Sequence, residues 1–282
     1  MSQRQSVIII EASSKRSGIN LKEVWRYKDL LYFMVLRDVT VLYKQTVLGF
    51  AWAIINPLFQ IVIFSIVFGS LAGVRPDVQS MPYPVFSCLA VIPWTYFSNS
   101  LNQAGTSLIS SSSVFTKVYF PRIIIPFTSV LSKLVDFAIS FSILIMLMIY
   151  FKYHPGSNVV FVLIPLSLVI ITSAGLGLWF SSLSLQYRDF KFALSFMMPV
   201  LMYLAPVAFP ASLVLNKFGA TAYHAYALYP LVGVIEGFRA SFAINKPMPW
   251  QLISIGFVSA IFILTSGIFY FRKMEKYFAD IA

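Results

Sequence analysis

The chain has 282 residues, of which 59% are hydrophobic, 17% aromatic and only 11% charged. A soluble domain carries roughly twice that share of charged residues, so the composition excludes an ordinary soluble globular protein. Membrane proteins gather Lys and Arg in cytoplasmic loops, which explains the net charge of +11, and we expect no nucleic-acid partner. The single cysteine, Cys88, excludes an intrachain disulfide and any cysteine-based metal site.

The amino-terminal part of the chain predicts a helix at the membrane surface. Its first apolar run, Val7 to Ile10, is too short for a signal peptide, so the first span begins later and is retained. From Leu21 to Lys44, apolar residues recur at helical spacing while charged residues mark another face, which is typical of an amphipathic helix on the inner leaflet. A helix packed on a partner protein is the alternative, and the two do not exclude each other.

Long stretches without charge follow, and several are long enough to cross a bilayer, which takes about 20 apolar residues. Only internally bonded helices or closed barrels are stable in hydrocarbon, and the two-residue alternation of barrel strands is missing. The sequence therefore predicts an all-α integral membrane protein. We expect six spans, at residues 49–74, 83–105, 131–151, 159–185, 192–215 and 250–271.

The distribution of basic residues sets the direction of the spans. With six spans, 15 Lys and Arg lie on the side of both termini and five on the other side. The positive-inside rule then predicts cytoplasmic termini. A seventh span at Phe218 to Ile235 would move the basic residues 272, 273 and 276 outside. We therefore expect residues 218–241 to form a re-entrant or surface-lying outer hairpin, broken at Pro230 and Gly233. Residues 1–48 and 272–282 form the cytoplasmic ends, and residues 49–271 the transmembrane domain.

Two pairs of opposite charge stand three residues apart, a spacing that brings side chains together on a helix. Lys133 and Asp136 lie in the third span, where an ionisable pair is either structural or a proton relay. We favour the structural pair, with Lys133 near the cytoplasmic end and its amine reaching the interface. Glu236 and Arg239 in the outer hairpin are interpreted in the same way.

Catalytic motifs are missing from the sequence. It has no phosphate-binding G-x-x-x-x-G-K-[ST] loop, no Asp-x-Asp pair and no Gly-x-Ser-x-Gly elbow. His154 and His224 are far apart in the chain and have no cluster of ligands around them, so we expect no metal site. The chain is therefore predicted not to be an enzyme.

Uncharged polar and aromatic residues share helical stripes in the first two spans. Sugars stack their apolar ring faces on aromatic side chains and pair their hydroxyls with amides, so such a surface suits a glycan. Aromatic belts and interhelical amide bonds give a structural explanation for the same residues. The candidate conduit residues are Trp52, Asn56, Phe59, Gln60, Trp94, Tyr96, Phe97 and Asn99.

Several segments resemble the permease subunits of ABC-type polysaccharide exporters. The run RDVTVLYKQTVLGFAW at residues 37–52, followed by Asn56-Pro57-Leu58, is similar to the entry into their first span. Three further segments occur in matching order: Lys117-Val118-Tyr119-Phe120-Pro121-Arg122, Tyr187-Arg188-Asp189, and Tyr229-Pro230-Leu231 with Glu236-Gly237-Phe238-Arg239. Leu42 departs from the pattern, since members often carry a second basic residue there.

This resemblance implies a homodimer of six-span subunits in the plasma (inner) membrane of a bacterium, joined by two copies of a cytoplasmic ATPase. ATP and Mg²⁺ would act on that partner, and this chain would hold no cofactor. The substrate would be a lipid-linked glycan such as an O-antigen. The implied coupling surface lies in the inner segment 107–118 and the loop that follows the fourth span, with Ser111, Val114, Lys117, Tyr187, Arg188 and Asp189. The implied outer gate contains Tyr229, Pro230, Glu236 and Arg239.

Two other functions compete with this one. A secondary transporter or lipid scramblase would use Lys133 and Asp136, but such proteins usually show paired internal repeats and broken helices, which the sequence lacks. A membrane-bound glycosyltransferase would need acidic metal ligands, which the sequence also lacks.

Overall fold

The computed structural model describes residues 25–44, 49–78, 80–112, 120–187 and 189–278, and within these ranges it has nine α-helices and no strand. The predicted all-α fold class is therefore confirmed. A π-helical segment (Ser65–Leu71) extends α3, and a 3-10 segment (Ser157–Val162) leads into α7. The helices are α2 (Lys28–Lys44), α3 (Gly49–Phe64), α4 (Tyr83–Ser110), α6 (Ile124–Tyr150), α7 (Leu163–Gln186), α8 (Phe190–Leu204), α9 (Ser212–Tyr226), α10 (Pro230–Phe242) and α11 (Trp250–Glu275).

Four helical segments are long and apolar enough to cross a membrane: Ala51–Leu71, Ile124–Tyr150, Ser157–Gln186 and Trp250–Glu275. They correspond to the first, third, fourth and sixth predicted spans, and they make the chain a multi-pass membrane protein. Helix α4 has 28 residues, but polar side chains such as Asn99 and Gln103 lower its hydropathy. Helix α8 has only 15 residues and ends at Leu204. The predicted total of six spans is therefore not confirmed.

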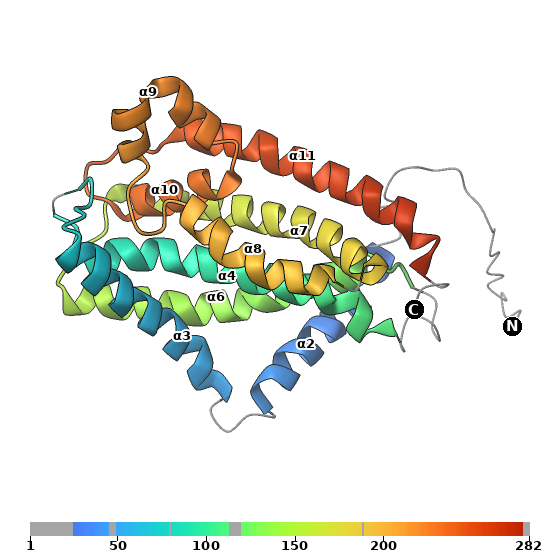
Figure 1. Cartoon of the computed structure of the whole chain (residues 1–282). Coiled ribbons are helices and arrows are strands. Elements are labelled where there is room, and N and C mark those ends of the chain that lie inside the picture. Colours follow the sequence, from blue (N-terminus) through green and yellow to red (C-terminus); the bar gives the residue numbers. More distant parts are fainter. Residues whose placement is uncertain (1–24, 45–48, 79, 113–119, 188, 279–282) are drawn as a thin grey trace, which may run out of the picture.

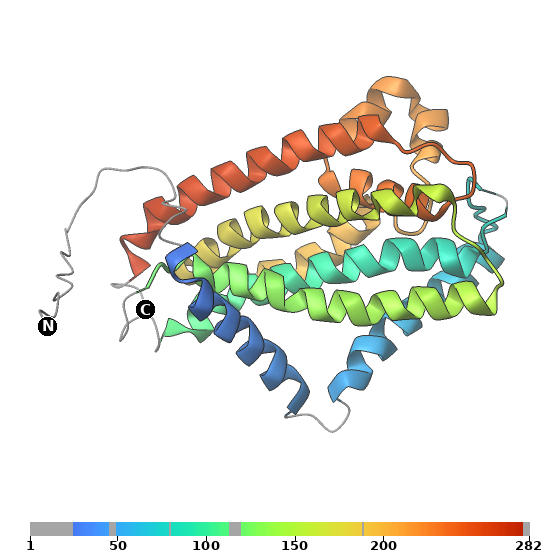
Figure 2. The same cartoon turned by 180° about the vertical axis from the view of Figure 1, so that it is seen from behind.

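The long helices lie side by side in the order α11, α7, α4 and α6 (Figures 1 and 2). The short helix α10 packs on α4, α7 and α11 near one end of this layer. Helices α2 and α3 diverge from the layer, and α2 packs on α6. Helices α4, α7 and α11 end at the side of the bundle where α6 and α8 begin (Figure 1).

Small residues allow α7 and α11 to approach backbone to backbone. A Cβ atom on Gly175 would lie 2.7 Å from the Leu264 nitrogen, and one on Gly267 would lie 2.5 Å from the Gly175 oxygen. One turn along, the Trp179 ring stacks on Tyr270 with centroids 4.2 Å apart. Close packing of this kind stabilises helix pairs in lipid, where burial of apolar surface gives little driving force.

The third long helix begins earlier than the sequence predicted. Helix α6 begins at Ile124 rather than near residue 131, so Lys133 lies well inside the helix. The residue is 8% exposed, and its Nζ donates to Asp136 Oδ2 at 2.9 Å. The short distance confirms the predicted pairing.

In the region of the predicted hairpin, α10 begins at Pro230 as expected, but Gly233 does not break it. Gly233 is helical and packs closely against the backbone of Leu252. A side chain at position 233 would collide with that backbone. The bend lies instead at Gly219 inside α9, where φ is +84°. Glycine adopts this backbone region without the steric cost that other residues incur.

Replacing Gly267 with Leu is expected to destabilise the protein by about 1–3 kcal/mol or more, because the added side chain overpacks the contact with Gly175. Thermal unfolding of the purified protein in detergent measures the effect. The matched control is Val258→Leu, on the exposed face of the same helix. Equal unfolding temperatures for the two variants would show that the close approach of α7 and α11 does not stabilise the protein.

Candidate functional site

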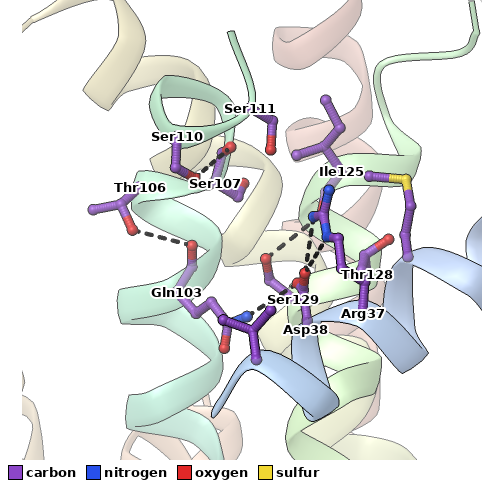
Figure 3. Close-up of a pocket in the computed structure, with 12 residues that line it drawn as sticks. Arg37, Asp38, Gln103, Thr106, Ser107, Ser110, Ser111, Ile125, Thr128 and Ser129 are labelled. Atoms are coloured by element: carbon purple, nitrogen blue, oxygen red, sulfur yellow. Dashed lines mark hydrogen bonds and ion pairs between the residues drawn. The ribbon is translucent and has the colours of Figure 1, made fainter. Parts of the chain in front are cut away.

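A polar cavity of about 340 Å³ lies between α2, α4 and α6 (Figure 3). Helix α2 contributes Arg37 and Asp38, α4 contributes Gln103 and a row of hydroxyls, and α6 contributes Thr128 and Ser129. The apolar side chains of Met34, Val41 and Ile125 complete the walls. The cavity is therefore amphipathic, with polar groups from three helices converging on one space.

A charge pair on α2 accepts a hydrogen bond from α4 inside this cavity. Arg37 donates from Nε and Nη2 to Asp38 Oδ1, at 3.1 and 2.8 Å. Gln103 Nε2 donates to the other carboxylate oxygen, Asp38 Oδ2, at 3.2 Å. Hydrogen bonds to a charged group are stronger than neutral ones, so this contact holds α2 against α4.

The hydroxyl groups of the cavity donate to their own helices. Ser107 Oγ donates to the Ala104 oxygen at 2.7 Å, and Thr128 Oγ1 to the Ile124 oxygen at 2.9 Å. Ser110 does the same on the next turn of α4. Since each hydroxyl has one proton and two lone pairs, these oxygens remain acceptors toward the cavity.

The residues of the predicted coupling surface are only partly described. Ser111 follows the last residue of α4, is buried and lines the polar cavity. Tyr187 and Asp189 are exposed at the junction of α7 and α8. Val114, Lys117 and Arg188 lie outside the described residues. The ends of α4 and α7 are at the same end of the bundle (Figure 1), where Leu185 joins an apolar cluster with Leu108.

The candidate conduit residues divide into an exposed and a buried group. On α3, Trp52 is 49% exposed, Phe59 is 65% exposed, and Asn56 lies on the same outward stripe. Asn99 on α4 is also exposed. The buried oxygen Gln60 Oε1 has no partner among the described residues. By contrast, the core of the single chain contains Trp94, Tyr96 and Phe97, with the Tyr96 hydroxyl donating to the Val130 oxygen.

A second outward aromatic stripe lies on α8, where sequence reasoning missed it. Phe192 and Phe196 are 73% and 76% exposed, and Tyr203 lies two turns further along the helix. Their spacing at helical intervals was the available signal. Both α3 and α8 pack against α4, so the two stripes flank this helix.

A buried cluster of charges lies at the opposite end of the bundle from the polar cavity. Arg239 is 1% exposed, and its Nη1 donates to Glu236 Oε1 at 3.0 Å, which confirms the predicted pairing. Lys246 bridges Glu236 and Asp77, at 3.2 and 3.3 Å. The Arg239 guanidinium also lies 3.6 Å from the centre of the Phe86 ring on α4.

These charges hold the irregular chain that follows α8. Arg239 donates from Nη2 to the Val207 oxygen at 2.8 Å and from Nη1 to the Phe209 oxygen at 3.1 Å. Glu236 Oε1 accepts a hydrogen bond from the Ala211 nitrogen at 3.0 Å. Backbone groups without helical partners are therefore satisfied by side chains of α10.

The other two residues of the predicted outer gate, Tyr229 and Pro230, lie at the start of α10. Tyr229 precedes α10 and donates to the Leu201 oxygen of α8 at 3.2 Å, and buried Pro230 is the first residue of α10. The structure thus brings together all four residues assigned to the gate around α10. Their role as a gate stays a prediction.

Electrostatics favour the ionised carboxylate of Glu236, whose pKa is lowered. Burial alone would raise the pKa of the Glu236 carboxyl. The positive charges of Lys246 and Arg239 outweigh this effect, so the pKa lies below its ordinary value. On α9, burial raises the pKa of Tyr223 to about 12, and the carboxylates of Glu236 and Asp77 add to this shift. Tyr223 is therefore a neutral phenol at physiological pH.

Removing one member of the buried pair is expected to cost about 3–5 kcal/mol, because it leaves an uncompensated charge. Glu236→Gln and Arg239→Met should each lower the unfolding temperature, and the double variant should recover part of the loss. Lys217→Met is the matched control, since it removes an exposed charge from α9. Additive losses in the double variant, measured by thermal unfolding in detergent, would contradict the pairing energy.

Comparison with known proteins identifies the family. Residues 29–243 match the family model described as "ABC-2 type transporter". The chain is 27% identical to the O-antigen export system permease protein RfbA of Klebsiella pneumoniae, over 90% of this chain and 95% of that protein. It is 24% identical to the protein of the same name from Myxococcus xanthus, over 90% and 96%. The polysialic acid transport protein KpsM of Escherichia coli is 25% identical, over 78% and 82%. Because the family model covers most of its length, the chain belongs to the ABC-2 type transporter family.

Proposed function

We propose that the chain is the permease subunit of an ATP-driven exporter that moves a lipid-linked polysaccharide, similar to an O-antigen, across the bacterial inner membrane. The observation that carries this proposal is the alignment with export permeases over nearly the whole length of both proteins. The sequence has no phosphate-binding loop, so ATP and Mg²⁺ would act on a separate cytoplasmic ATPase, present in two copies. No cofactor on this chain is part of the proposal.

The exposed stripes of α3 and α8 support a conduit between two copies of the chain. Trp52 and Phe59 on α3, and Phe192 and Phe196 on α8, present ring faces away from the bundle that contains them. Aromatic rings stack with the apolar faces of sugars, and Asn56 and Asn99 supply amide groups for hydroxyls. A homodimer that brings these faces together would enclose a path for a glycan.

The proposed orientation follows from the basic residues. Both termini face the cytoplasm, where 15 of the Lys and Arg would lie, and the hairpin of α9 and α10 faces outward. Residues 1–48 and 272–282 are then cytoplasmic, and residues 49–271 form the transmembrane domain with six spans. The ATPase would dock where α4 and α7 end, near Ser111, Tyr187 and Asp189.

A secondary transporter or lipid scramblase is the competing function, and one observation favours it. Lys133 and Asp136 form a partly buried ion pair inside α6, and an ionisable pair at membrane depth is a candidate relay. We favour a structural pair, because replacement of a buried ion pair by apolar residues is often tolerated.

Export assays separate the two functions. Trp52→Ala and Phe59→Ala should each slow export, and the double variant should nearly stop it, since each aromatic contact contributes about 1 kcal/mol. Lys133→Met combined with Asp136→Leu should cost little. Surface glycan per cell, at matched permease abundance and with ATPase assembly confirmed, is the measurement.

Phe262→Ala is the control for this series, because it removes an equally exposed aromatic ring from α11. The reverse pattern, with export lost in the variant without the ion pair and retained in the α3 variants, would favour ion coupling and overturn the proposed function.

The topology is tested by cysteine accessibility after Cys88 is replaced by Ser. Reagents that cannot cross the membrane should label a cysteine at Ser157 or Lys217 in intact cells. A cysteine at Lys276 should be labelled only after lysis. External labelling at position 276 would refute the six-span arrangement.

A further inference from the structure

We infer that the polar cavity between α2, α4 and α6 binds one uncharged sugar unit of the exported glycan at the cytoplasmic side of the permease. This inference rests on the proposed function and deepens it, because it names the chemical group that the chain recognises before transport. The cavity lies outside the exposed stripes of α3 and α8, and no predicted conduit residue lines it.

The size and shape of the cavity suit a small ring. Its volume of about 340 Å³ is at the lower end of the range of ligand pockets, about 300–1,000 Å³. Polar groups of α2, α4 and α6 share the lining with the apolar side chains of Met34, Val41 and Ile125. A pyranose has the same division, with hydroxyls around its edge and C–H groups on its faces.

The hydrogen-bonding groups suit hydroxyls better than phosphates. The hydroxyls of Ser107, Ser110 and Thr128 donate to their own helices, so their oxygens offer acceptors to the cavity. Asp38 adds carboxylate oxygens, while Gln103 and Arg37 supply N–H donors. Sugar hydroxyls both donate and accept, so they can pair with every group in this set.

The charge of the cavity argues against the anionic part of a lipid-linked substrate. Among the described residues that line it, Arg37 is the one cationic side chain, and Asp38 neutralises this charge at 2.8 Å. A phosphate accepts hydrogen bonds only, so the N–H groups of Gln103 and Arg37 would donate to it, but the carboxylate of Asp38 would repel it. The occupant that fits is therefore the neutral sugar and not a pyrophosphate.

The position of the cavity connects recognition to the proposed ATPase surface. Ser111 lines the cavity and also belongs to the predicted coupling segment. A sugar held between α2 and α4 would bridge the two helices that Asp38 and Gln103 already join. Occupancy would thus stiffen the segment that transmits closure of the ATPase.

Protection from alkylation tests the site in the complete complex of permease and ATPase in nanodiscs. Ser110→Cys places a thiol at the cavity, and Ser157→Cys gives a control far from it, both with Cys88 replaced by Ser. The probes are glucose, galactose, mannose, rhamnose and N-acetylglucosamine, with inorganic pyrophosphate as the anionic alternative. At least one sugar should slow maleimide labelling of position 110 about tenfold when its concentration is ten times its Kd. Labelling of position 157 should stay unchanged.

Two substitutions separate binding from folding. Gln103→Leu removes the amide donor, and Thr128→Val removes a hydroxyl with nearly no change in volume, so each should weaken sugar protection in a folded complex. Protection by pyrophosphate, failure of every sugar, or sugar protection unchanged in both variants would overturn the inference. Surface glycan produced by the wild-type permease tests the proposed function separately, since export can persist when position 110 is never protected.

Discussion

Backbone N–H and C=O groups buried in a membrane bundle must form hydrogen bonds without water. Arg239 supplies such hydrogen bonds where the chain leaves its helical conformation. Helix α8 stops at Leu204, and the chain then runs without helical bonding until α9 begins. Arg239 and Glu236 pair with the carbonyls and the amide of that segment, and Lys246 and Asp77 complete the charge balance. One helix, α10, therefore positions the end of α8, the start of α9 and the adjoining face of α4.

The molecule combines a tightly packed layer with two loosely held helices. Glycines bring α7 against α11 and α10 against α11, and α4 is buried between α6 and α7. In contrast, α3 and α8 present much of their apolar surface outward and contact the layer mainly through α4. Any rearrangement that accompanies transport meets less resistance at these two helices than within the layer.

Hydropathy predicted the all-α class and six spans, of which four correspond to long apolar helices, because lipid-facing helices such as α6 and α11 must be apolar. The i,i+3 spacing of Lys133 with Asp136 and of Glu236 with Arg239 predicted both ion pairs. The end of α8 was missed, since the side chains that replace its helical bonds come from α10. Hydropathy also cannot separate Trp94, which is buried in the core, from Trp52, which is exposed. The polar cavity joins three helices distant in the sequence, so no local pattern pointed to it.

The polarity of α4 has a consequence for the way the chain enters the membrane. This helix has the least apolar composition of the long helices, yet most of its residues are buried against protein. During synthesis it leaves the ribosome after α3 but before α6, α7 and α10, which later cover it. Before those helices are made, the face of α4 that carries Ser87, Ser100 and Ser107, all buried in the folded chain, would be exposed to lipid. The burial of this face of α4 therefore depends on α6 and α7, which are made after it.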